Sequence, residues 1–209
     1  MRTIKTLLCL ASTLLCFSVH AQKPLFSHSA GVGIYAGNSD YVAGGLLYSP
    51  RINFAVLSER ATFSIGTHLG LGGNLSYAGD GYQRSTSLTF FTDMPLVVEY
   101  NFGNAATRVA NTKFGGFIGG GYGWHFVKRE ESIHTDVFEG TVERDLNIYG
   151  PVINGGFRFP IGRASFGVRF SYMFRTAGDA ISYDYGNNGL DGIGSVAFVF
   201  NIGTWIRNK

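Results

Sequence analysis

The sequence predicts an all-β fold, an eight-stranded antiparallel up-and-down transmembrane β-barrel. Three observations lead to this class: the composition, a hydrophobic period of two residues, and small or polar residues opposite the bulky face. Glycine accounts for 30 of 209 residues, aromatic residues for 15% and charged residues for only 15%, with 5 prolines. So much glycine without a collagen repeat disfavours helices and suits closely spaced strands, which excludes an all-helical bundle.

The first 21 residues have the pattern of a secretory signal peptide, and we expect the barrel domain to cover residues 22–209. Two basic residues precede the apolar run 7–19, and the segment ends in a small residue, Ala21. Both cysteines, Cys9 and Cys16, lie in this segment, and neither follows the small residue of a lipoprotein acylation site. The exported chain is therefore expected to carry neither a disulfide nor a lipid anchor.

The charge of the exported chain does not indicate a partner. Without Arg2 and Lys5, the 17 basic residues become 15 against 14 acidic residues, a net charge of +1. Such a balance gives no basic field for nucleic acid, which is not an expected partner. Beyond the signal peptide no apolar run reaches the roughly 18 residues that a membrane-spanning helix needs. A membrane crossing would therefore have to use strands.

Alternation of apolar with polar or small residues predicts eight strands. The pattern is clearest in 88–102, 165–175 and 195–203, where every second residue is mostly a large apolar one. The other segments follow the same period with more glycine. In chain order the expected strands are 28–36, 43–57, 61–76, 86–102, 113–128, 146–160, 163–176 and 192–205.

The connections between these strands alternate in length, which indicates two unlike ends. Short turns are expected at 57–60 and 160–163, and long polar loops at 77–85, 129–145 and 177–191. The segment 103–112 is an exception, because it is long for the short-turn end. In bacterial outer-membrane barrels the short turns face the periplasm, so both termini are expected on that side.

Bulky residues on one strand face and small residues on the other indicate a membrane barrel. One face of 114–127 carries Gly115, Phe117, Gly119, Gly121, Gly123 and His125, and the other carries Phe114, Ile118, Tyr122, Trp124 and Phe126. Large residues outside and small ones inside are what lipid selects. A soluble β-sandwich stays open as the alternative, because it shares the period of two. Aromatic residues near strand ends would supply interfacial girdles: Tyr35, Tyr48, Tyr77, Tyr100, Trp124, Tyr149, Tyr172 and Trp205.

The signal peptide, the eight segments, and stretches such as PLVVEYNFG (95–103) and NGGFRFPIG (154–162) resemble small outer-membrane β-barrel proteins of Gram-negative bacteria. The resemblance is nearest to barrel domains of the Bacteroidota, and more distant to OmpX, OmpW and the OmpA barrel. It covers essentially the whole exported chain and implies the barrel fold and a location in the cell outer membrane. The sequence departs from this pattern at its last strand, where four residues follow Trp205. The peptidoglycan-binding domain of full-length OmpA is not expected.

The face assigned to the lumen gathers eight ionisable residues. Unpaired ions inside a narrow barrel would be costly, so we expect an Arg–carboxylate network that fills the interior as a polar plug. A narrow small-solute channel for protons or small ions is the alternative. The residues are Arg51, His68, Asp93, Glu99, His125, Arg158, Arg169 and Arg175.

Catalysis is not expected, although some barrels of this size, by resemblance, hydrolyse or transfer lipid A acyl chains. The catalytic groups would be His125 or His134 with an acid from the set Glu130, Glu131 and Asp136. No spacing holds a histidine against a hydroxyl and a carboxylate, and there is no G-x-S-x-G motif. The loop 178–192 contains Asp179, Asp184 and Asp191 but does not match a calcium-binding loop, so no metal and no cofactor is expected.

Recognition is expected in the long loops of a rigid barrel. Expected partners are outer-membrane lipid and lipopolysaccharide and, through the loops, another envelope protein or a surface ligand. The sequence thus predicts a non-enzymatic integral outer-membrane protein with a structural or interaction role. A lipid A-modifying enzyme is an alternative, and resemblance to PorT-like proteins adds an accessory barrel of a secretion or assembly complex. The loop residues expected to take part are Tyr77, Tyr82, Arg84, Phe138, Tyr183 and Tyr185.

Overall fold

The computed structural model describes residues 25–37, 41–79, 83–106, 113–135, 139–161, 164–178 and 191–202. The expected signal peptide lies outside these residues. The strands are β1 (Leu25–Ala36), β2 (Val42–Ser58), β3 (Ala61–Thr67), β4 (Leu69–Gly79), β5 (Gln83–Gly103), β6 (Gly115–Thr135), β7 (Glu139–Ile161), β8 (Ala164–Phe174), β9 (Ala177–Gly178) and β10 (Gly192–Ile202).

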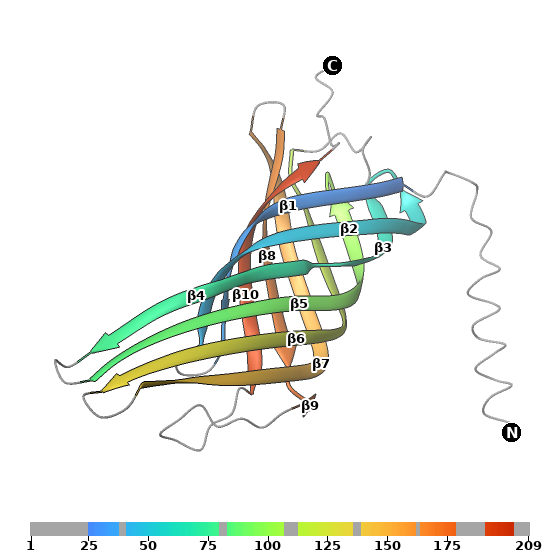
Figure 1. Ribbon diagram of the computed structural model, residues 1–209. Helices are drawn as coiled ribbons and strands as arrows, with labels where there is room; N and C mark the ends of the chain where they lie inside the picture. The colour runs from blue at the N-terminus through green and yellow to red at the C-terminus, as the bar shows by residue number, and fades with distance from the viewer. Residues whose placement is uncertain are drawn as a thin grey trace, which may run out of the picture.

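The strands form one closed antiparallel sheet (Figure 1). β3 and β4 both lie between β2 and β5, so they act as a single barrel strand interrupted at His68. The two residues of β9 only extend the edge beside β7. Eight strands therefore follow one another around the ring, and β1 pairs with β10 to close it, with Val32 opposite Phe198. This confirms the predicted fold class.

The predicted loop at 129–145 is wrong, because strand pairing continues through most of it. β6 runs on to Thr135 and β7 begins at Glu139, with His134 paired to Glu139. The predicted loop at 77–85 shortens in the same way, since Ala78 pairs with Ser85. These segments are too polar to show a hydrophobic period, but a backbone ladder started in the barrel can propagate through them.

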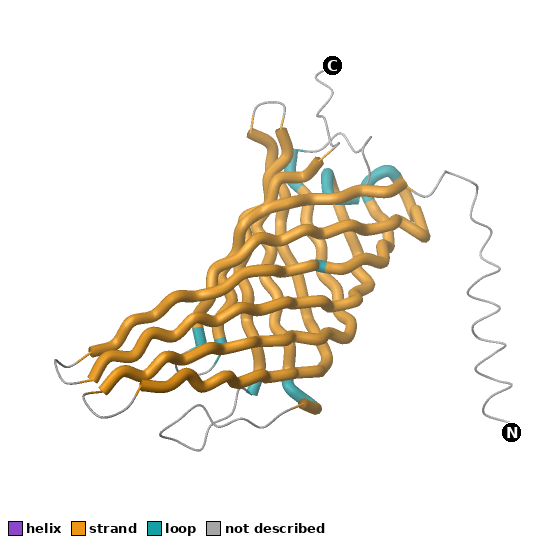
Figure 2. The backbone as a smooth tube through the Cα atoms, in the orientation of Figure 1, coloured by secondary structure: helices purple, strands orange, loops and turns teal. Residues whose placement is uncertain are grey.

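The two ends of the barrel differ in shape. We call the end where β1 begins and β10 ends the terminal end, and the opposite end the distal end. At the distal end β4, β5, β6 and β7 continue past the other strands as a projecting sheet, seen at the lower left of Figures 1 and 2. Beyond the last pairing of β2 with β4, Gly44 with Gly73, these four strands pair only among themselves and with β9.

The outer face of the barrel is apolar. In β10, Phe198 is 45% exposed whereas its neighbours Ala197 and Val199 are 2% and 3% exposed. Exposed large apolar side chains occur on all eight barrel strands, among them Ile34, Leu46, Leu71, Leu96, Ile118, Ile153, Phe170 and Val196. The alternation therefore points the bulky residues outward, as the sequence predicts, and such a surface is typical of barrels that span membranes.

No helix long and apolar enough to cross a membrane occurs among the described residues.

The close approach of β5 and β6 requires a glycine at position 121 of β6. A Cβ atom on Gly121 would lie 1.8 Å from the backbone carbonyl oxygen of Leu96 on β5. Any side chain at this position would force the two strands apart. Gly121 is thus required by backbone packing between β5 and β6, in addition to the small residue size that the lumen demands.

Candidate functional site

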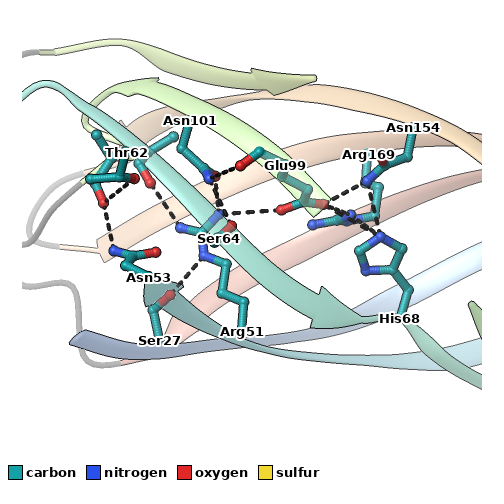
Figure 3. Close-up of polar contacts among 12 residues, drawn as sticks. Ser27, Arg51, Asn53, Thr62, Ser64, His68, Glu99, Asn101, Asn154 and Arg169 are labelled. Carbon is teal, nitrogen blue, oxygen red and sulfur yellow. Dashed lines mark hydrogen bonds and ion pairs between the residues drawn. The ribbon is translucent and has the colours of Figure 1, made fainter. Parts of the chain in front are cut away.

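The terminal half of the lumen holds a connected polar cluster, drawn in Figure 3. Its members come from different strands and point inward because inward and outward positions alternate along each strand. All of them are at most 6% exposed. We define this lumen cluster as Arg51, His68, Glu99, Asn101, Asn154 and Arg169.

Glu99 lies at the centre of the lumen cluster. Its Oε1 accepts a hydrogen bond from Nη1 of Arg169 at 2.7 Å, and its Oε2 lies 3.7 Å from Nη1 of Arg51. Asn154 also donates to Oε1. One carboxylate therefore joins β2, β5, β7 and β8 across the barrel, which makes it the main electrostatic link of the interior.

His68 contributes hydrogen bonding rather than charge. Its Nε2 receives N–H groups from two donors, Arg169 Nη1 and Asn154 Nδ2, the second at 3.0 Å. Guanidinium and amide nitrogens can only donate, so this nitrogen carries no proton and the ring is neutral. The break between β3 and β4 at His68 therefore brings an acceptor into a cluster that is rich in donors.

The connection after β5 folds back under the terminal end. Arg51 Nη2 donates to the carbonyl of Ala105 at 2.8 Å, and its Nε donates to Ser27 Oγ at 2.7 Å. The carbonyl of Ala106 accepts from Asn53 at 2.9 Å and from Thr62 at 3.2 Å. This gives the turn in the unexpectedly long segment 103–112 a structural role, since its carbonyls satisfy buried donors.

The distal half of the lumen corrects the expectation of a polar interior. It contains a packed apolar core rather than a charge network. Apolar and polar inward residues follow the same period of two, so this period did not predict the apolar core. The core consists of Tyr35, Tyr41, Ala43, Leu47, Phe91, Val97, Val127, Leu146, Ile148, Val152, Met173, Ile193, Ala197 and Val199. Tyr35, expected in an interfacial girdle, is 1% exposed inside it, with its ring 4.4 Å from that of Phe91.

Asp93 and His125 form a second polar group inside this apolar core, separate from Glu99. Asp93 Oδ1 lies 3.0 Å from Nδ1 of His125, and Tyr41 Oη lies 3.0 Å from its Nε2. Because an ionised carboxylate only accepts, Nδ1 carries the proton and Nε2 accepts from the tyrosine hydroxyl. The order acid, histidine, hydroxyl is that of a catalytic triad, but His125 is 0% exposed and stacks on Phe91.

The two remaining predicted lumen residues belong to neither polar group. Arg175 lies beyond the end of β8, half-buried, where its backbone N–H donates to the carbonyl of Asp191 at 3.0 Å. Arg158 is buried in the lumen but belongs to none of the ion pairs found among the described residues, which corrects the expectation of full pairing.

The side chains of all six predicted loop residues lie outside the described residues. Tyr77 belongs to β4 and Arg84 to β5, but their side chains are outside the described residues. Tyr82, Phe138, Tyr183 and Tyr185 lie outside them entirely, as do Asp136, Asp179 and Asp184. Where the structure describes the chain, it contains no group of three or more metal-ligating side chains.

Of the candidate catalytic groups, only His125 and Glu130 have described side chains, and these two do not meet. His134 and Glu131 are in β6, with side chains outside the described set. Glu130 lies 3.7 Å from Lys128 on the same strand, five residues beyond His125. The acid that does meet His125 is Asp93.

Sequence reasoning missed several members of the site. Asn101 and Asn154 lie at inward positions and could have been found by extending the alternation that placed Glu99 and Arg158. No sequence signal marks Tyr41, because it belongs to the connection between β1 and β2.

The fold and its interior define a class: a closed up-and-down β-barrel of eight antiparallel strands, filled by side chains and apolar outside. No family model and no curated protein sequence matches the chain. Among solved structures it is similar to Ail, the attachment invasion locus protein of Yersinia pestis, at 10% identity over 87% of this chain and 100% of that chain, with a TM-score of 0.48. The N-terminal β-barrel domain of Pseudomonas aeruginosa OprF matches at 13% identity over 86% and 100% of the two chains, with a TM-score of 0.37.

Proposed function

We propose that the protein is an integral outer-membrane β-barrel without catalytic activity, and that it acts by binding another protein at the cell surface. The membrane placement is supported by the apolar outer face, where Leu46 and Ile118 are 68% and 65% exposed. A water-soluble protein would leave this continuous apolar surface in water, at high free-energy cost. The ring closure supports it too, because a closed barrel leaves no backbone group unpaired in lipid.

The projecting sheet is the observation that carries the interaction role. The sheet has two outer edges, residues 74–79 of β4 and residues 139–147 of β7. Apart from their neighbours within the sheet, β5 and β6, these residues pair with no described strand. Such edges offer backbone donors and acceptors to a strand from a partner. The β7 edge contains three acidic residues and Arg144, whereas the β4 edge, NLSYAG, has no charged residue. Charges discourage strand addition, so the β4 edge is the proposed docking site.

The filled interior favours binding over transport or catalysis. The lumen cluster and the turn at Ala105 fill the terminal half, and the apolar core fills the distal half and extends to Ala197 and Val199, which lie opposite Arg169 and Gly167. His125, the histidine with a triad-like arrangement, is enclosed by aromatic rings and offers a substrate no exposed atom. Conductance in planar bilayers tests a channel, and lipid A mass spectra with and without the protein test an enzyme.

Single introduced cysteines test orientation and docking together. Both native cysteines lie in the expected signal peptide, so an added cysteine would be the only one in the exported chain. Leu75→Cys lies on the β4 edge, Thr141→Cys on the charged β7 edge, and Glu59→Cys on the turn at the opposite end. In whole cells an impermeant maleimide should label the first two variants, and label Glu59→Cys only after permeabilisation.

A photoactivatable crosslinker on the same cysteines then tests the interaction. We expect one discrete protein adduct from Leu75→Cys, and little from the other two variants. The adduct should disappear when Ser76→Pro is added to disturb the β4 edge. Equal crosslinking from all three positions, or none from position 75, would contradict the docking site. Labelling of Glu59→Cys in intact cells would overturn the orientation.

A further inference from the structure

Arg158 is a buried cation that forms no ion pair with the lumen cluster. It is 4% exposed, and its Nε has no hydrogen-bond partner. On both neighbouring strands the residue paired with it is a glycine, Gly115 on β6 and Gly167 on β8, so no side chain from those positions covers it. The charges that act on its guanidinium are the repelling Arg51 and Arg169 and the attracting Glu99.

The charges around Arg158 do not balance. Among the buried side chains of the described residues there are three guanidinium groups, from Arg51, Arg158 and Arg169, and one carboxylate, Glu99. His68 is neutral by its hydrogen bonds, and Asp93 is paired with His125 in the other half of the lumen. His125 is also neutral, because its Nε2 accepts from Tyr41, so the three guanidinium groups face two carboxylates, Glu99 and Asp93, and one positive charge remains without a counter-charge. A buried ion in this condition is costly unless a partner neutralises it.

Beyond Gly167, the lumen wall next to Arg158 carries the apolar side chain of Val199 and, toward the terminal end, a row of small polar side chains. Ser49, Ser29, Asn201 and Ser165 are all buried and follow one another in register across β2, β1, β10 and β8. Ser165 faces Pro160, which lies two residues from Arg158 on β7. Serine hydroxyls can donate to an anion as readily as they accept from one another. The surroundings thus supply donors but no second carboxylate.

We propose that the terminal half of the lumen binds a small inorganic anion, of the size of chloride or phosphate, at Arg158 with the adjoining serine wall. Arg158 provides the direct contact, because Arg51 and Arg169 already donate to Asn101, Ser27, Ala105 and Glu99. Those two guanidinium groups add positive potential. The bound anion takes the place of the missing carboxylate, and the barrel is most stable with the site occupied.

The test compares the thermal unfolding midpoint of the folded protein in detergent in different sodium salts at equal ionic strength. Bromide and phosphate are the probes, and gluconate is the large anion that should not enter. In the parent we expect bromide or phosphate to raise the midpoint by roughly 2–4 °C over gluconate, which corresponds to an anion in modest excess over its dissociation constant. Arg158→Gln should lose this rise.

Two further variants separate the site from general effects of salt. Arg60→Gln removes an exposed arginine from the β2–β3 turn at the same end, and should keep the full anion response. Arg158→Glu supplies a fixed carboxylate, so it should be independent of the anion and at least as stable as the parent in gluconate. A parent that melts alike in all three salts, or an Arg158→Gln variant that keeps the response, would overturn the proposal.

Direct observation remains possible if both Arg158 variants fail to fold. Crystals of the parent grown with bromide should show an anomalous peak within hydrogen-bonding distance of the Arg158 guanidinium. Absence of that peak in a lumen that is otherwise ordered would overturn the site. The result does not bear on surface docking at the β4 edge, so the two proposals fail independently.

Discussion

Replacing Glu99 by glutamine should destabilise the barrel more than any other single polar change in the lumen. Glu99→Gln keeps the size of the side chain and removes the only buried carboxylate among the described residues. The 2.7 Å contact with Arg169 would lose its ionic character, and Arg51 would lose a charge 3.7 Å away. The terminal half of the lumen would then hold three guanidinium groups and no carboxylate.

The magnitude follows from what is left unpaired. Removing one partner of a buried ion pair typically costs about 3–5 kcal/mol, because the other charge stays buried. His68 still accepts a hydrogen bond from Arg169 and is itself held by Asn154, which argues for the lower half of that range. If the cost comes from the orphaned cation, removing it as well should relieve it. The double variant Glu99→Gln/Arg169→Met should therefore regain about 1–3 kcal/mol relative to Glu99→Gln.

The assay is equilibrium unfolding of the protein in lipid vesicles by urea, followed by tryptophan fluorescence and by electrophoretic mobility without boiling. Glu59→Gln, an exposed carboxylate on a turn, is the matched control and should change the free energy of unfolding by less than about 0.5 kcal/mol. The reasoning is refuted if Glu99→Gln is as stable as the control, or if the double variant is less stable than Glu99→Gln.

Three further outcomes are expected from the same unfolding assay. Phe170→Arg should lose about 2–4 kcal/mol, because a cation would face lipid at a position that is 45% exposed, whereas Phe170→Leu should lose far less; equal losses would contradict the face assignment. Gly121→Ala should prevent folding or cost several kcal/mol, because its Cβ would meet the Leu96 carbonyl, whereas Gly44→Ala, with nothing within 4 Å, should be close to neutral. Gly103→Ala should cost several kcal/mol, since φ is 63° at this last residue of β5 and its Cβ would lie 2.3 Å from the backbone carbonyl oxygen of Phe114; a variant as stable as the parent would contradict this.

The sequence predicted most of the barrel because its signal is local. A period of two in the side chains decides which residues face outward, and it needs no knowledge of strand pairing. Phe170 and Phe198 were placed correctly for that reason, and both are 45% exposed. Where the apolar residues end, the period of two ends as well, so the sequence predicts a loop between Lys128 and Leu146 where the structure has the ends of β6 and β7.

The site was predicted less well, because it depends on register between strands that are distant in the chain. The sequence placed Glu99, Arg51 and Arg169 on inward faces, but only the pairing shows that they meet while Asp93 meets His125. For the same reason the sequence did not predict that Arg158 lacks an ion-pair partner among the described residues. A count of charges per face gives an approximate balance, and the distances decide which charges are satisfied.

The pairing of β1 with β10 has a consequence for how the molecule is made. Every other contact around the ring joins barrel strands that follow one another along the chain, so hairpins can zip successively at small entropic cost. The seam alone joins the first strand to the last, with His28 opposite Ile202. In the proposed membrane placement, the edges of β1 and β10 would lie in hydrocarbon with their amides and carbonyls unsatisfied until the seam forms. The bilayer would then drive closure, and the barrel would stay incomplete until β10 is added.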